Sequence, residues 1–580
     1  MSASMTRGGI AIPERPALGR VSTVEEQDRA VDELVAAKDR WARRTLSERI
    51  EVLDRLMRAM AAVSPDWVAA ECAEKGYVPG SPESGAEWFG GPVFVLRTAR
   101  LLRNTLRDLE RGAQPAHGPV RLLTDGQVAV RVFPTDAYDR ILYAGYDSEV
   151  WLDRSVGSTR ISATVARAYR NGSSRGEVCL VLGGGNLSAI QPADVLHQLF
   201  AENRSVVLKC SPVQEHLGPL LEEVFAPLID ADALRVVYGG AQVAQRLAHL
   251  PGVDRVHMTG SDKTYDALMW GTDAEAEGRR RENRPRLAKP FTAELAQVSP
   301  VIVVPGPWSP NDLRYQGESV ASMTLFNAGH ICVSARVLLT QSTWPQRHGL
   351  LDAVRSALRE APALPAYYPG SAERHVSVLD AYPHAERCGE PSGAFLPPLL
   401  IPHVPADATE PALSTDPFCS VLAEVPLDAD DPAQFLDQAV QVCNDRIWGS
   451  LGVVILVHPR TRREPATAAA LARALKRLRY GTIVVNAGAG LPYAMVSPPW
   501  GAYPGNDPRD IGSGTGFVHN TYLLGDIEKA VTHGPWRVRP KPAWFPSHRR
   551  PHQVMRRLAA LEADPDPRKL PSLLQAALRG

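Results

Sequence analysis

The amino-acid sequence predicts an α/β protein with two parallel-sheet domains and a separate β-hairpin. Short apolar runs alternate with helical segments along most of the chain, which is the pattern of repeated βαβ units. Glycine-rich turns follow directly after two of these runs, at 183–185 and 239–240. A length of 580 residues leaves room for two or three domains.

The composition excludes several classes of protein. Hydrophobic residues make up 44% of the chain, and 64 basic residues balance 64 acidic ones. This balance produces no net field that would attract nucleic acid or an anionic membrane surface. No apolar run reaches the length of a transmembrane helix. Residues 1–23 lack the apolar core of a secretory signal, and we expect a flexible lead there.

The seven cysteines are scattered, and no two of them have CxxC spacing. An odd and irregular set argues against a disulfide framework and against a structural zinc site. We therefore expect a cytoplasmic protein without a bound metal, because the reducing cytoplasm keeps thiols free.

The N-terminal part is predicted to be helical. Apolar residues recur at helical spacing over 24–63, and Thr45 begins a capping box that starts a new helix. Further helices are expected near 66–75 and 90–110.

A β-hairpin is predicted at 119–134. Apolar alternation flanks Asp125-Gly126, a dipeptide typical of tight hairpin turns. Because an isolated two-stranded ribbon is marginally stable, we expect this hairpin to pair between subunits as an oligomerisation element.

The cofactor-binding α/β domain is predicted to span 24–293. Its expected strands are 178–182, 205–208, 235–238 and 255–259. Its expected helices are 193–202, 215–225 and 241–250. Parallel sheets of this kind bind nucleotides at the carboxyl ends of their strands. The glycine turns do not complete a GxGxxG pattern, so tight turns alone remain the alternative interpretation. Residues 271–290 are acidic and then basic, which indicates either a solvated loop or an anion site.

A second, catalytic α/β domain is predicted to begin at Glu294 and to end at residue 500. Its expected strands are 301–304, 336–340, 453–456 and 482–485. Its expected helices are 350–359 and 432–443. Residues 501–580 are predicted to form a C-terminal oligomerisation segment and tail extension, with amphipathic helices near 554–561 and 570–578.

Cys332 is the candidate nucleophile. A glycine-containing turn precedes it and an apolar, β-branched run follows it. A buried structural cysteine needs no such turn, whereas a nucleophile does, because the turn presents the sulfur. Glu294 lies 38 residues upstream and is a possible base for the same chemistry.

Five local patterns in a fixed order resemble the aldehyde dehydrogenase superfamily. They are GNLS at 185–188, VVLKCSP at 206–212, VDRVHMTGS at 253–261, ELAQVSP at 294–300 and NAGHIC at 327–332. Weaker matches are TDPF at 415–418, GTIVVN at 481–486 and SPPWG at 497–501. The resemblance covers roughly residues 24–535. It implies two Rossmann-type α/β domains plus the small β-hairpin oligomerisation element, and a homodimer or homotetramer.

The resemblance also implies roles for individual residues. Cys332 would attack an aldehyde, the Asn186 amide and the Cys332 backbone N–H would hold the oxyanion, and Glu294 would activate water. The implied cofactor is NAD or NADP. The implied cofactor-binding residues are Lys209, Ser211, Gly240, Gly260, Ser261, Asp416 and Phe418.

Several positions depart from the family pattern. Pro212 replaces a common acidic residue, which makes NADP plausible because a carboxylate there would repel a 2′-phosphate. Asp416 is one carbon shorter than the usual glutamate, and His330 is interpreted as a packing residue rather than a base. The segment 138–175 is longer than the corresponding segment of the family. Its aromatic side chains are candidates for lining the substrate pocket: Tyr143, Tyr146 and Trp151.

Three functions are compatible with these residues. The first is oxidation of a small-molecule aldehyde to an acid with NAD or NADP. The second is a relative that transfers the acyl group to or from CoA, against which Glu294 argues because acyl transfer needs no base for water. The third is a cofactor-binding protein without catalysis, against which the joint presence of Cys332, Glu294 and Asn186 argues.

Overall fold

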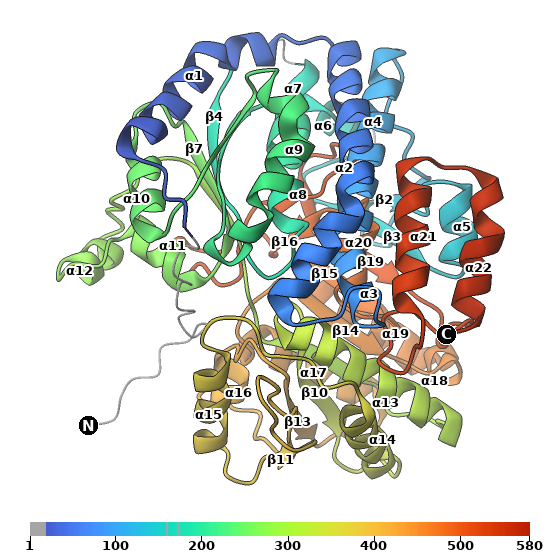
Figure 1. Cartoon of the computed structure of the whole chain (residues 1–580). Helices are drawn as coiled ribbons and strands as arrows, with labels where there is room; N and C mark the ends of the chain where they lie inside the picture. Colours follow the sequence, from blue (N-terminus) through green and yellow to red (C-terminus); the bar gives the residue numbers. More distant parts are fainter. Residues whose placement is uncertain (1–18, 158–159, 171–174) are drawn as a thin grey trace.

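The chain divides between two large sheets (Figure 1). The structure is a computed structural model that describes residues 19–157, 160–170 and 175–580, so most of the expected N-terminal lead lies outside the described residues. The six-stranded sheet has the order β17-β8-β7-β4-β5-β6, and the eleven-stranded sheet has the order β1-β2-β3-β19-β15-β14-β9-β10-β13-β12-β11. The short edge strands are β17 (Gly514–Thr515) in the first sheet, and β12 (Leu399–Ile401) and β11 (Glu386–Arg387) in the second. The α/β fold class with two sheet domains is therefore confirmed.

The six-stranded sheet is mainly parallel. Its parallel strands are β4 (Val178–Leu182), β5 (Ser205–Lys209), β6 (Leu234–Val237), β7 (Arg255–Gly260) and β8 (Phe291–Leu295). The helices that connect or flank them are α8 (Ile190–Leu196), α9 (Gly218–Ile229), α10 (Ala241–His249) and α11 (Asp262–Met269). Every residue of β4 and β5 is buried, as expected where helices cover both faces.

Glu294 lies in β8, beside Thr259 of β7. The predicted start of the second α/β unit at Glu294 therefore falls inside a strand of the first sheet, which ends at Leu295. Residues 291–295 combine Phe, Thr, Ala, Glu and Leu, a run too mixed to be recognised as a buried strand. As a result Glu294 belongs to the sheet that borders the predicted cofactor site.

The second sheet has a parallel centre. Its central strands are β9 (Ser299–Val303), β10 (Ala335–Gln341), β13 (Val421–Leu427), β14 (Gly452–Leu456) and β15 (Thr482–Val485). Its main helices are α13 (Pro310–Leu325), α14 (Arg347–Glu360), α17 (Pro432–Asp445) and α19 (Pro465–Arg477). The sequence patterns did not indicate α13, α19 or β13.

The predicted hairpin forms, but it is not isolated. It consists of β1 (Val120–Leu122) and β2 (Val128–Phe133). Strand β2 pairs with β3 (Asp147–Leu152), β3 pairs with β19 (Ile527–His533), and β19 joins β15 of the same chain. The hairpin is therefore stabilised by strands of its own chain, and the prediction that it needs a second subunit for stability is wrong. Strand β1 remains an exposed edge, and its pairing with another subunit stays a prediction.

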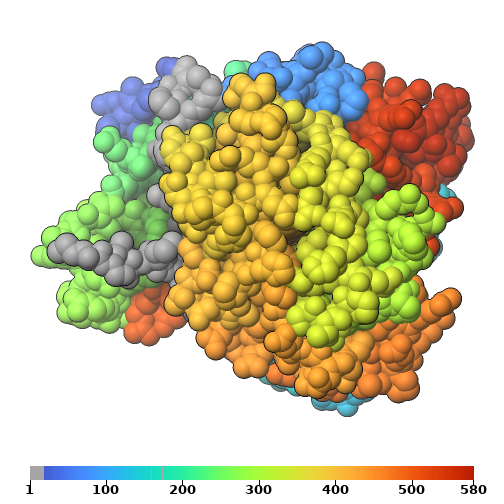
Figure 2. All heavy atoms as spheres, turned by 90° about the horizontal axis from the view of Figure 1, so that it is seen from below, coloured from blue at the N-terminus to red at the C-terminus, as the bar shows by residue number. Residues whose placement is uncertain are grey.

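The C-terminal extension is part of the core. The predicted helices are α21 (Pro551–Ala563) and α22 (Leu570–Leu578), and they stand beside the N-terminal helices (Figure 1). Arg97 and Arg100 of α4 (Phe94–Glu110) form buried ion pairs with Glu562 of α21 at 2.8 and 2.7 Å. Figure 2 shows the same lobe at one edge of the molecule. None of the described helices is both long and apolar enough to span a bilayer.

Candidate active site

A tight turn between α13 and β10 presents Cys332. Asn327 and Ala328 have φ of 53°, and Gly329 has φ of 78°, so three successive residues adopt the left-handed conformation that L side chains rarely occupy. A Cβ atom on Gly329 would lie 2.5 Å from the Cys419 carbonyl carbon. Glycine is therefore required at this position, and the turn predicted from sequence has a specific shape.

Cys332 and Glu294 meet, as the sequence predicted. The Cys332 Sγ donates a hydrogen bond to Glu294 Oε1 at 3.5 Å. Burial, followed by the nearby charge of Asp194, raises the pKa of Glu294 to about 7. Burial and the Glu294 carboxylate raise the pKa of the Cys332 thiol well above its usual range. The thiol is therefore protonated at neutral pH, and Glu294 is placed to accept its proton.

Asn186 lies in the loop after β4 and reaches the same turn. Its Nδ2 donates to the His330 carbonyl oxygen at 3.0 Å. The His330 imidazole is buried and its Nε2 lies 2.8 Å from Ser371 Oγ, and burial lowers its pKa well below the usual range. His330 is accordingly placed as a packing residue.

Two cavities meet at these residues. The thiol cavity has a volume of about 120 Å³ and the larger cavity about 340 Å³. Both are lined by Asn186, Ile190, Glu294 and Cys332. The thiol is therefore reachable from both sides, as a reaction between two ligands requires.

The wall of the thiol cavity comes from distant segments. Its large side chains are Phe89, Phe94, Leu187, Met323, Phe326, Leu491, Tyr493, Trp500 and Trp544. These residues were not predicted, because no local sequence pattern places Phe89, Met323, Tyr493 and Trp544 together. The aromatic residues predicted to line the substrate pocket were wrong: none of Tyr143, Tyr146 and Trp151 lines the thiol cavity. Tyr143 packs on Phe133 and Tyr146, and Trp151 lies in a hydrophobic core cluster.

The larger cavity contains most of the predicted cofactor residues. Its walls include Lys209, Ser211, Pro212, Gly260, Ser261, Asp416 and Phe418. Gly240 does not line it. It precedes α10, whose first residues Ala241 and Gln242 line the cavity instead. The carboxyl ends of β4, β5 and β7 converge here, which is where parallel sheets bind nucleotides.

Asp416 has one engaged and one unengaged carboxylate oxygen. Its Oδ1 accepts from Arg336 Nε at 2.8 Å and from the Phe418 backbone N–H at 2.9 Å. Its Oδ2 is buried and has no hydrogen-bond partner. A buried, unsatisfied oxygen in a ligand-sized cavity is suited to accept from a ligand hydroxyl. Arg336 also donates to the Gly329 carbonyl at 2.7 Å, so it joins Asp416 to the thiol turn.

Ser261 is the N-cap of α11. Its side chain accepts from the Thr264 backbone N–H at 3.2 Å, and Ser261, Asp262 and Thr264 line the larger cavity. The N-terminus of a helix attracts anions through its free N–H groups and its dipole. This end of the cavity therefore suits a phosphate group.

The basic segment 271–290 is largely satisfied by its own carboxylates. Arg279 pairs with Asp273 at 2.5 Å, and Arg284 pairs with Glu282 at 2.5 Å. Among the described residues that line the larger cavity, Thr272 is the only one from this segment. These pairs favour the solvated-loop interpretation over an anion site.

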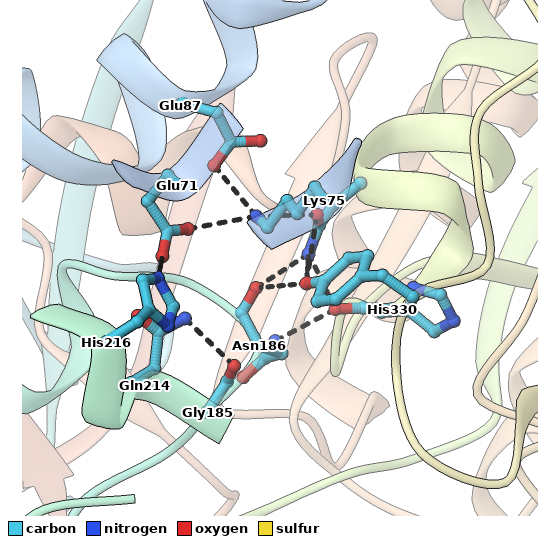
Figure 3. A network of polar contacts seen from close by, with 10 residues as sticks. Glu71, Lys75, Glu87, Gly185, Asn186, Gln214, His216 and His330 are labelled. Carbon is cyan, nitrogen blue, oxygen red and sulfur yellow. Dashed lines mark hydrogen bonds and ion pairs between the residues drawn. The ribbon is translucent and has the colours of Figure 1, made fainter. Parts of the chain in front are cut away.

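A buried ionic network supports the thiol turn from behind (Figure 3). Lys75 Nζ lies 2.7 Å from Glu87 Oε2, 3.2 Å from Glu71 Oε2 and 3.3 Å from Asn327 Oδ1. Asn327 Nδ2 in turn donates to the Asn186 carbonyl oxygen at 2.7 Å. The Asn327 side chain therefore connects Lys75 to Asn186, whose amide is the predicted oxyanion donor. The sequence showed no signal for this link, because Lys75 is an ordinary last-turn lysine of α2 (Leu46–Lys75).

Comparison with known proteins points to one family. The aldehyde dehydrogenase family model matches residues 157–363. N-succinylglutamate 5-semialdehyde dehydrogenase of Sphingopyxis alaskensis is 27% identical over 181 residues, covering 31% of this chain and 33% of that protein. 4,4′-diaponeurosporen-aldehyde dehydrogenase of Staphylococcus aureus is 25% identical over 160 residues, 28% of this chain and 31% of that protein. These alignments span about a third of the length of the curated relatives.

Solved structures share the fold over nearly the whole chain. An aldehyde dehydrogenase of Mycobacterium tuberculosis complexed with NAD⁺ has a TM-score of 0.59 at 17% identity, covering 89% of this chain and 91% of that one. The NADP-dependent glyceraldehyde-3-phosphate dehydrogenase of Bacillus halodurans, complexed with NADP, has a TM-score of 0.57 at 17% identity, covering 90% and 95%. The family match includes Asn186, Glu294 and Cys332, and the solved structures show that the chain shares the fold of these aldehyde dehydrogenases.

Proposed function

We propose that this protein oxidises an aldehyde to a carboxylic acid, with NAD or NADP as the hydride acceptor, through a thiohemiacetal and a thioester on Cys332. The observation that carries the proposal is the Cys332–Glu294 pair, which lies where an apolar cavity and a larger, more polar cavity meet. The aldehyde would occupy the thiol cavity, and the dinucleotide would occupy the larger one.

The larger cavity fits a dinucleotide by its donors and acceptors. The unengaged Asp416 Oδ2 suits a ribose hydroxyl, and the N-terminus of α11 at Ser261 suits the pyrophosphate. Lys209 and Ser211 line the part near β5. Pro212 at this place leaves room for either dinucleotide, because no carboxylate there would repel a 2′-phosphate. When bound, the dinucleotide supplies a nicotinamide ring that takes up a hydride.

The residues at the junction account for the chemical steps. Glu294 accepts the thiol proton, and the Cys332 thiolate attacks the aldehyde carbon to give a tetrahedral oxyanion. The Asn186 amide and the Cys332 backbone N–H stabilise that oxyanion. Collapse of the oxyanion with loss of hydride leaves a thioester. Glu294, after releasing its proton, removes a proton from water, and the hydroxide formed cleaves the thioester to the acid and the free thiol.

The test is formation of reduced cofactor from a panel of aldehydes, with NAD and NADP, and with and without CoA. Turnover without CoA supports the proposal. Strict dependence on CoA would instead select an acyl-transferring enzyme, and binding of NAD or NADP without turnover of any aldehyde would select a non-catalytic protein.

The pH dependence should report Glu294. Because Glu294 must be deprotonated to accept the thiol proton, we expect kcat/KM to fall about tenfold per unit below pH 7 and to level off above it. Glu294→Gln should remove this inflection. Asp194→Asn is the matched control: it should move the inflection to lower pH, since the Asp194 charge helps raise the pKa of Glu294. An inflection that persists unchanged in Glu294→Gln would contradict the assignment.

The oxyanion assignment predicts a separate effect. We expect Asn186→Ala to lower kcat by roughly 10²–10³-fold, the usual cost of one oxyanion donor, while the dissociation constant of NAD or NADP changes little. Stopped-flow measurement of the hydride-transfer burst would locate the loss in the first chemical step. A loss confined to KM would show that Asn186 only shapes the pocket.

A further inference from the structure

A third cavity adjoins the thiol cavity. This distal cavity has a volume of about 100 Å³ and is lined by residues of the helical N-terminal part, of α13 and the turn after it, of the segment that follows α14, and of the C-terminal extension. It shares Phe89, Ser322, Phe326 and Trp544 with the thiol cavity. The two cavities are therefore separated by side chains and not by backbone layers.

Aromatic rings form the partition. Phe89 stacks on Trp544 with ring centroids 6.5 Å apart and an interplanar angle of 22°. Phe326 meets Phe89 edge-on at 6.3 Å. Trp544 is half-buried and lies in the irregular segment between β19 and α21. The partition therefore consists of ring faces and edges, and a substrate tail that crosses it must displace these side chains.

The lining of both cavities selects against charge. Among the described residues, no Lys or Arg lines the thiol cavity or the distal cavity. A carboxylate or phosphate on the substrate would be desolvated there without a counter-ion, which is strongly unfavourable. The distal cavity carries Glu83 and His548 at its wall, and its other lining is dominated by apolar side chains such as Leu325, Leu364 and Met555.

We propose that the two cavities form one substrate site for an uncharged aldehyde with a long apolar tail. The aldehyde carbon lies at Cys332, and the tail passes the Phe89–Trp544 stack into the distal cavity. This inference rests on the proposed function and names its substrate class. It also gives the C-terminal extension a role, because Trp544, Phe545, Pro551 and Met555 line the distal end.

Chain length provides the test. Each additional buried methylene contributes up to about a fourfold gain in binding, so kcat/KM should rise at least about tenfold from hexanal to dodecanal. Succinic semialdehyde, which carries a carboxylate, should be a poorer substrate than hexanal. A flat profile from hexanal to dodecanal, or a preference for succinic semialdehyde, overturns the inference.

A matched pair of variants locates the tail. Ala361 lines the distal cavity, whereas Ala363, two residues away, is exposed and does not. Ala361→Phe should reduce kcat/KM for dodecanal to the level of hexanal and leave hexanal within about twofold. Ala363→Phe should behave as the parent protein. An unchanged dodecanal-to-hexanal ratio in Ala361→Phe overturns the inference.

Two further measurements keep the outcomes separate. If Ala361→Phe does not fold, Leu364→Phe fills the same cavity from another position. 1-Dodecanol, an uncharged analogue with the same tail, should bind the parent protein in calorimetry at least about tenfold more tightly than it binds the filled variant, and equal affinity again overturns the inference. No turnover of hexanal by the parent protein would contradict the proposed function itself, which distinguishes the two failures.

Discussion

Replacement of Cys332 by alanine is expected to lower kcat for aldehyde oxidation by on the order of 10⁴- to 10⁶-fold, the range found when a nucleophile is removed from a covalent mechanism. The thiol is the group that would carry the acyl intermediate, and its hydrogen bond to Glu294 Oε1 shows the partner that would take its proton. Reduced-cofactor formation at saturating aldehyde measures the loss.

Cys443→Ala is the matched control for this variant. Cys443 is a buried free cysteine in α17 and lines neither the thiol cavity nor the larger cavity. We expect its activity to stay within about twofold of the parent protein. Mass spectrometry of Glu294→Gln incubated with aldehyde and NAD or NADP at alkaline pH, where the Cys332 thiol ionises without Glu294, should show an acyl adduct on Cys332, because that variant cannot activate water efficiently. Substantial turnover by Cys332→Ala would exclude the thioester mechanism.

Replacement of Lys75 by methionine is expected to destabilise the protein by about 3–5 kcal/mol, the usual effect of removing one partner from a buried ion pair. Lys75, Glu71 and Glu87 are all at most 3% exposed. Loss of Lys75 would leave the Glu87 carboxylate without its cation and Glu71 with His216, 2.7 Å away, as its remaining partner. Lys75 also contacts Asn327 in the thiol turn. We therefore expect kcat to fall as well, at temperatures where the variant remains folded.

The deficit of Lys75→Met should depend on pH. Burial raises the pKa of Glu87, and Lys75 opposes that rise, so loss of Lys75 should raise the pKa of Glu87 further. A carboxyl group whose pKa is higher in the folded than in the unfolded state favours folding at low pH and loses that contribution as pH rises. The variant should therefore be closer to the parent protein at pH 5 than at pH 8 in urea denaturation.

Two control variants separate charge from packing. Lys75→Met combined with Glu87→Gln should recover part of the lost stability, because it removes the buried charge left unpaired. Lys38→Met removes a partly exposed ion pair with Asp254 and should cost no more than about 1 kcal/mol. Equal deficits for Lys38→Met and Lys75→Met would show that the buried network carries no special stabilisation.

Much of the six-stranded sheet was predictable from local pattern. The strands β4, β5, β6 and β7 lie within one residue of their predicted ends, because each is a short apolar run bounded by turn residues. Strand β8 was not predictable in this way. Its hydrophobic pattern is weak, and its strand conformation depends on pairing with β7 and β17.

The predicted site residues differ in how far sequence could place them. Cys332, Glu294 and Asn186 belong to recognisable patterns, and the structure brings them together. Arg336 and Lys75 carry no pattern at all, although they contact Asp416 and the thiol turn. Their positions depend on contacts between segments that are more than 70 residues apart in the chain.

The sequence by itself determined the strand–helix alternation, the glycine turn before Cys332 and the family resemblance, because these are encoded in neighbouring residues. The tertiary structure decided what surrounds the thiol. It decided that the hairpin joins the sheet of its own chain, that Glu294 lies near the end of β8, and that Phe89 and Trp544 meet at the thiol cavity. Such contacts form between chain segments far apart in sequence, where packing and burial act and local propensity does not.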